Sequence, residues 1–274
     1  MEKLKIVFMG TPDFAVGILD TIYQNNYEIV GVVTAPDKPA GRGQKVSMSA
    51  VKEYALKKNL HVLQPTNLKS EAFLNELRSL NANLQVVVAF RMLPEVVWKM
   101  PKLGTFNLHA SLLPEYRGAA PINWAIINGE TKTGVTTFFI DDKIDTGAII
   151  LSKEISINNS ETAGELHDRL MLLGSNAVLE TLQLIEEKKA TTTLQTENTA
   201  VKTAYKLNKE NCQIDWNQSG TAIYNLVRGL SPYPAAWTLI KDGGKEWNVK
   251  IYAVKFEEKE HLNAIGTLVT TKKE

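Results

Sequence analysis

The sequence has 274 residues, of which 44% are hydrophobic and 22% charged, with a formal net charge of +1. This length suits a large domain followed by a smaller one, and the composition excludes a disordered or fibrous chain. The near-zero charge argues against a protein that coats nucleic acid non-specifically, and the single cysteine, Cys212, excludes a disulfide framework or a metal site built from cysteines.

Over the first 190 or so residues, strand patterns alternate with helical patterns. This alternation predicts an α/β domain with a Rossmann-like, mostly parallel sheet and helices on both faces. The first apolar run is too short for a signal peptide, and no apolar stretch could span a bilayer, so we expect a cytoplasmic protein with no membrane contact. Strands are expected at residues 6–9, 29–34, 62–64, 84–90, 105–109, 135–140 and 149–155.

Two helices have clear start signals. Thr11 is expected to cap the first helix, with Pro12 at its first position and Asp13 at the positive end of its dipole. A long helix is expected over residues 161–189, where Thr162 and Glu165 form a capping box. Gly10 ends the first strand without the further glycines of a dinucleotide-binding fingerprint, so we do not expect NAD or FAD.

The pattern changes near residue 190. Six threonines with little periodicity lie between residues 190 and 203, which predicts a linker over 190–204 between a catalytic domain (1–189) and a second domain (205–274). The second domain is expected to have a helix near 221–229 and strands at 237–240, 249–254 and 265–270. Short strands of this kind are typical of a small, OB-like β-barrel.

Asn107 and His109 are the first candidates for chemistry. Residues two apart on a strand point to one face, and this strand ends where parallel sheets bind ligands. An amide beside an imidazole can stabilise an oxyanion and move a proton, although such a pair is more often structural. Asp145 precedes a Thr-Gly turn and either faces this pair or only caps the turn.

Two longer stretches resemble the folate-dependent formyltransferase family. They are residues 106–130, FNLHASLLPEYRGAAPINWAIINGE, and residues 141–150, DDKIDTGAII. The family signature joins an Asn-x-His pair, a Ser-Leu-Leu-Pro loop and a downstream Asp-x-Gly. Residues 8–15, 35–45, 204–210 and 214–216 are similar to those members of the family that formylate methionyl-tRNA, so the resemblance covers essentially the whole chain.

The resemblance implies which residues form the site. Asn107, His109 and Asp145 would be the catalytic trio, with no metal and no permanently bound cofactor. The implied folate contacts are Val88, Ala89, Phe90, Arg91, Ser111, Leu112, Leu113, Pro114, Asp141 and Asp142. Residues 89–94, AFRMLP, are one residue shorter than the commoner AYGLILP, which leaves the side-chain roles of Phe90 and Arg91 open. The family's second domain usually has several further strands, so the barrel is expected to be incomplete, through truncation or as a minimal form.

The expected reaction is transfer of the formyl group of 10-formyltetrahydrofolate, a co-substrate, to the free amino group of initiator methionyl-tRNA, for translation initiation. The basic, glycine-rich loop with Lys38, Arg42 and Lys45 suits a distorted acceptor end and its phosphates. The alternatives are a sugar-nucleotide N-formyltransferase, a 10-formyltetrahydrofolate hydrolase and a non-catalytic tRNA-binding module. The family implies a monomer.

Overall fold

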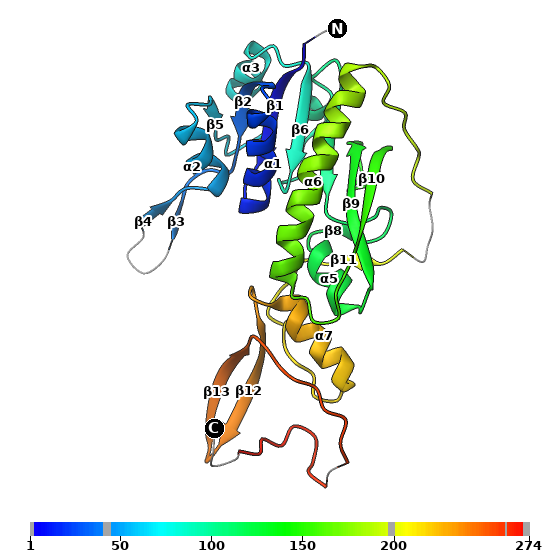
Figure 1. The fold of residues 1–274 in the computed structure, drawn as a ribbon. Helices are drawn as coiled ribbons and strands as arrows, with labels where there is room; N and C mark the ends of the chain where they lie inside the picture. The colour runs from blue at the N-terminus through cyan, green and yellow to red at the C-terminus, as the bar shows by residue number, and fades with distance from the viewer. Residues whose placement is uncertain (1–2, 41–44, 197–200, 261, 271–274) are drawn as a thin grey trace. The chain divides into compact units, whose positions relative to one another are not determined.

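The computed structural model describes residues 3–40, 45–196, 201–260 and 262–270 (Figure 1). The chain forms two compact units. Unit 1 comprises Met1–Gly118, Thr133–Ile155 and His167–Thr203, and unit 2 comprises Ala119–Lys132, Ser156–Leu166 and Ala204–Glu274. Two segments that precede residue 189, Ala119–Lys132 and Ser156–Leu166, therefore belong to unit 2, and the domain limits at residues 189 and 205 stay predictions.

Unit 1 is built around a seven-stranded sheet in the order β10-β9-β7-β6-β1-β2-β5. All seven predicted strands are present: β1 (Lys5–Gly10), β2 (Glu28–Val33), β5 (Val62–Leu63), β6 (Leu84–Val88), β7 (Thr105–His109), β9 (Lys132–Phe139) and β10 (Ile149–Ser156). The strands from β5 to β7 pair in parallel, and β9 joins β7 in antiparallel. The prediction of a mostly parallel sheet is confirmed.

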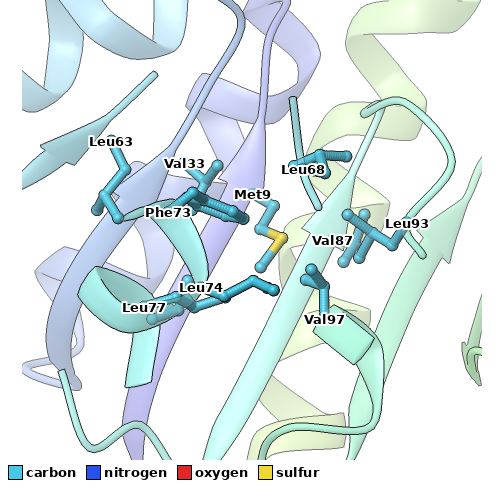
Figure 2. Close-up of a cluster of buried hydrophobic side chains, with 11 residues drawn as sticks. Met9, Val33, Leu63, Leu68, Phe73, Leu74, Leu77, Val87, Leu93 and Val97 are labelled. Carbon is cyan, nitrogen blue, oxygen red and sulfur yellow. The ribbon is translucent and has the colours of Figure 1, made fainter. Parts of the chain in front are cut away.

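Helices cover both faces of this sheet: α1 (Asp13–Gln24), α2 (Ala50–Lys57), α3 (Glu71–Ser79), α4 (Glu95–Trp98) and α6 (Ala163–Glu186). On one face, Gly174 of α6 lies against Leu108 of β7 so closely that an added Cβ would be 2.8 Å from it. On the other face, Figure 2 shows Met9 and Val87 of the sheet packed with side chains of α3 and α4. Val87 is the register partner of Asn107, so Asn107 faces this second layer.

The predicted helix starts are partly confirmed. The amide of Thr162 donates to Glu165 Oε2 (2.8 Å) and the amide of Glu165 donates to Thr162 Oγ1 (3.3 Å), which is the expected capping box. The prediction for α1 was wrong by one residue, because Pro12, with extended backbone, is the N-cap and Thr11 makes no cap. Asp13 lies in the first turn as expected.

Two short strand pairs were not predicted. β3 (Lys38–Ala40) and β4 (Lys45–Ser47) form an antiparallel pair in the basic loop, where we expected Pro39 and the glycines to break regular structure. β8 (Arg117–Gly118) pairs with β11 (Thr203–Ala204). Strands of two or three residues are too short to show a periodicity of two in sequence.

Unit 2 contains α5 (Pro121–Ile127), α7 (Gly220–Leu230) and the antiparallel strands β12 (Ala236–Asp242) and β13 (Lys245–Ile251). The expected helix and the first two strands are confirmed, but the strand predicted at 265–270 was wrong. That segment is exposed and pairs with no strand, and regular β structure needs a neighbouring edge. Within the described residues of unit 2, β12 and β13 form a two-stranded hairpin rather than a closed barrel.

No helix in the described part of the chain is both long and apolar enough to cross a bilayer.

Candidate functional site

His109 ends β7 and is held by the loop that follows it. The ring is buried, with 7% of its side chain exposed, and its Nε2 lies 2.8 Å from the carbonyl oxygen of Tyr116. A carbonyl only accepts, so Nε2 carries a proton and donates it. In the neutral ring Nδ1 is therefore the basic nitrogen, and Nδ1 faces Asp145 Oδ2 at 3.7 Å.

Asp145 lies in the turn between β9 and β10. Its Oδ2 accepts a hydrogen bond from the amide of Gly118 (2.9 Å), and only 15% of the side chain is exposed. The turn is capped instead by Asp141, whose Oδ1 accepts from Thr146 Oγ1 (2.7 Å) and from the amide of Lys143 (3.1 Å). The carboxylate of Asp145 is thus not used to cap the turn and is directed at His109.

The loop after β7 turns sharply between Tyr116, whose carbonyl contacts His109, and Gly118, whose amide contacts Asp145. Tyr116 has φ 59° and Gly118 has φ 119°, both in the left-handed region. This backbone conformation, which glycine adopts readily, lets the Tyr116 carbonyl face His109 while the Gly118 amide faces Asp145. Two backbone groups of one short loop therefore orient both side chains.

Asn107 is half-buried and lies on the His109 side of β7, whereas Phe106 and Leu108 are buried on the opposite side. Among the residues that the structure describes, its side-chain amide has no hydrogen-bond partner. Its donor is therefore open to a ligand. Asn107, His109 and Asp145 are brought to one end of the sheet, as expected for the first two; of the two alternatives left open for Asp145, the structure shows the one in which it faces His109.

The residues expected to contact folate fall into two groups. At the end of β6, Val88 is buried and Ala89 is exposed with a left-handed φ of 47°. The guanidinium of Arg91 donates to the carbonyls of Pro65 and Thr66, which fixes the loop after β6 against the loop after β5. Arg91 also lies over the ring of Phe90, with Cζ 5.7 Å from the ring centroid.

The second group surrounds the Ser-Leu-Leu-Pro loop. Ser111 is buried, and its hydroxyl donates to the Glu115 carbonyl (2.6 Å). Thr136 of β9 donates through Oγ1 to the Ser111 carbonyl (2.7 Å) and accepts from the amide of Leu113 (3.2 Å). These bonds shape the loop and occupy the serine hydroxyl. Leu112 and Pro114 are half-buried, Asp141 caps its own turn and Asp142 is exposed.

An open cavity of about 1030 Å³ lies beside the loop after β6. Its lining includes Arg91, Leu93, Leu68 and Lys69. Of the residues expected to contact folate, only Arg91 lines this cavity. No three His, Cys, Asp or Glu side chains within the described ranges are grouped as a metal ion would require.

The basic loop is anchored at its base. Asp37, just before β3, binds Lys52 Nζ (2.5 Å) and Gln64 Nε2 (2.8 Å), and the bond from Lys52 holds the pKa of that carboxyl below its usual range. Lys38 is exposed on β3. Arg42 and the side chain of Lys45 lie outside the described residues.

Sequence reasoning missed the supporting residues. Tyr116 and Gly118 act through backbone groups, for which side-chain identity gives little signal. Arg117 and Gln195 were also missed, because Gln195 lies in the segment assigned as a linker. The guanidinium of Arg117 donates to Gln195 Oε1, through Nη2 (2.6 Å) and Nε (3.1 Å).

Comparison with known proteins gives consistent results. The sequence matches the formyl transferase family over residues 4–182 and the formyl transferase C-terminal domain over residues 206–274. A methionyl-tRNA formyltransferase of Flavobacterium johnsoniae is 70% identical over 274 residues, which are 100% of this chain and 87% of the relative. A methionyl-tRNA formyltransferase of Bacteroides thetaiotaomicron is 52% identical over 273 residues, 98% of this chain and 85% of the relative.

Solved structures share the fold. A sugar 3N-formyl transferase crystallised with dTDP and 5-N-formyl-THF has a TM-score of 0.62 at 25% identity, covering 84% of this chain and 80% of that one. A 4-N formyltransferase from Francisella tularensis has a TM-score of 0.69 at 19% identity, covering 92% of this chain and 99% of that one. At 19% identity the second likeness concerns the fold alone.

Proposed function

The chain belongs to the formyltransferase family, and we propose that it transfers the formyl group of 10-formyltetrahydrofolate to the free amino group of initiator methionyl-tRNA. The observation that carries this function is the 70% identity, over the whole of this chain, to a methionyl-tRNA formyltransferase. The family resemblance stated from the sequence motifs is confirmed by the matches to both formyl transferase domains.

The geometry of the trio supports direct acyl transfer. The neutral amine attacks the formyl carbon, the carbonyl oxygen becomes an oxyanion, and the bond from that carbon to N10 of the folate then breaks. The open amide of Asn107 and the protonated Nδ1 of His109 would donate to the oxyanion. The amine loses one proton and N10 gains one, so the reaction consumes none and needs no covalent enzyme intermediate.

Asp145 would act on His109 through charge. Its carboxylate lies 3.7 Å from Nδ1, where its negative charge would stabilise positive charge that develops on the ring during the reaction. Because the Gly118 amide binds the same oxygen, the carboxylate keeps its direction while the ring gains or loses a proton. In this mechanism His109 transfers protons, and the charge of Asp145 stabilises His109.

The formyl donor is proposed to bind at the end of β6 and beside the Asp141–Asp145 turn. The left-handed φ of Ala89 and the bonds of Arg91 to the neighbouring loop give this region a defined backbone, which suits recognition of a pterin by main-chain groups. The tRNA is proposed to contact the basic loop through Lys38, Arg42 and Lys45. The anchor of Asp37 to Lys52 and Gln64 fixes where this loop starts.

The assay that tests this function follows labelled formyl from 10-formyltetrahydrofolate into three acceptors offered to the purified chain. We expect the label on initiator methionyl-tRNA, with little transfer to a sugar nucleotide bearing a free amine and little formate released in water. An Asp145→Asn variant controls for contaminating activity. Preferential labelling of the sugar nucleotide, or formate release that does not depend on tRNA, would contradict the proposal.

A further inference from the structure

The segment after α6 does not merely connect two domains, because it pairs with the strand that follows the Asp145 turn. Thr193 and Ile149, the first residue of β10, exchange two backbone hydrogen bonds of 2.8 and 2.9 Å. This bridge places Gln195, two residues further along, at the turn itself.

The side chain of Gln195 uses both ends of its amide there. Nε2 donates to the carbonyl oxygen of Asp145 (3.0 Å) and to that of Gly147 (2.8 Å). Oε1 accepts both bonds from the guanidinium of Arg117. Since a guanidinium only donates and carbonyls only accept, one orientation of the amide satisfies all four bonds, and Arg117 fixes it.

The two carbonyls that Gln195 binds belong to Asp145 and Gly147, and the backbone of Asp145 has an unusual conformation. Asp145 has φ 55°, a left-handed conformation that is unfavourable for a residue with a Cβ, although aspartate tolerates it better than most. The turn lies close to β9 at Gly147, where an added Cβ would be 1.7 Å from the Phe139 carbonyl oxygen, so no side chain fits there. Gln195 thus ties together the two residues whose backbone sets the direction of the Asp145 carboxylate.

We propose that Gln195 is a positioning residue that acts through Asp145, and that Arg117 supports it by orienting its amide. The inference rests on the proposed function, which gives Asp145 its role beside His109. Gln195 touches neither substrate in this account. It keeps the carboxylate of Asp145 facing Nδ1 of His109, 3.7 Å away.

The sharpest variant is Gln195→Glu in the whole 274-residue chain. It keeps an oxygen for Arg117 but replaces the donating NH2 with a second oxygen facing two carbonyls. With two donated bonds lost, kcat for initiator methionyl-tRNA should fall on the order of tenfold, while both KM values stay within about twofold of wild type. Leu194→Ala is the matched control, since that neighbouring side chain is 82% exposed.

A double-mutant cycle with Asp145→Asn separates positioning from general support of the fold. In the Asp145→Asn background, Gln195→Glu should cause almost no further loss of kcat, because the carboxylate it positions is gone. Three results would overturn the inference and leave the proposed function intact. These are equal losses of kcat in both backgrounds, a raised KM as the main effect of Gln195→Glu, and a wild-type kcat for that variant. A wild-type kcat for Asp145→Asn alone would overturn the role of Asp145 and the inference with it.

Discussion

The proton on His109 decides how the site can work. Because the Tyr116 carbonyl holds a proton on Nε2, a neutral His109 presents its lone pair at Nδ1, toward Asp145. The same ring, once protonated, presents a donor there. Asn107, on the same side of the strand, adds a donor that never changes charge. One fixed donor and one switchable donor suit a reaction in which an oxyanion forms and then collapses.

Asn107→Ala tests the fixed donor. The variant should lower kcat by about 10²–10³-fold, the usual loss for one oxyanion donor, with little change in thermal unfolding because the amide makes no hydrogen bond within the described residues. Steady-state formylation of initiator methionyl-tRNA measures the loss. Asn75→Ala, at an exposed position of α3, is the control. A near-normal kcat for Asn107→Ala would mean that the side chain is structural.

The residues of the site were predictable to different degrees. A period of two along β7 places Asn107 and His109 together, and the structure agrees. For Asp145 the residues alone left open whether it faces this pair or caps its turn, because its direction depends on the Gly118 amide and on a left-handed φ. Backbone donors and acceptors are common to all residues, so their part in the site could not be read from the sequence.

Helices and strands were predicted correctly where their sequence patterns were long. The seven strands of the large sheet and the capping box of α6 were predicted from apolar periodicity and from one Thr-x-x-Glu motif. The pairs β3·β4 and β8·β11 were not, since strands of two or three residues depend on their partners rather than on their own composition. The same dependence explains the error at 265–270, where an apolar strand pattern has no partner edge.

Asp37 anchors the basic loop, with its strands β3 and β4, to the rest of unit 1. Asp37→Asn therefore tests the proposed role of this loop in binding tRNA. Losing the ion pair with Lys52 should loosen the base of β3·β4 and raise the KM for methionyl-tRNA several-fold, with an unchanged KM for the folate. Glu53→Gln, which removes the same charge from an exposed position of α2, is the control. A change confined to the folate KM would contradict the role.

The pH dependence of this anchor has a definite sign. The pKa of Asp37 is lowered in the folded chain, first by the hydrogen bond from Lys52. Its contribution to stability is therefore fully present above the ordinary aspartate pKa of about 3.9 and is lost as the pH falls through the lowered value. The ion pair between Asp37 and Lys52 should therefore be intact at neutral pH.

At the scale of the whole molecule, the chain formylates methionyl-tRNA, and we propose that the residues at the end of β7 carry out the chemistry. The fold alone does not decide the acceptor, because sugar formyltransferases share it at 17–25% identity. The acceptor follows instead from the full-length similarity to methionyl-tRNA formyltransferases. The proposed chemistry rests on the geometry around His109.

Single-turnover transfer by wild type and His109→Ala tests this claim most directly. With enzyme in excess over labelled 10-formyltetrahydrofolate and saturating initiator methionyl-tRNA, the variant should bind both substrates but transfer formyl at least about 100-fold more slowly, the loss expected of a proton-transferring group. Binding of each substrate is measured separately at equilibrium. Transfer by His109→Ala at the wild-type rate, with formyl reaching the tRNA, would contradict the account.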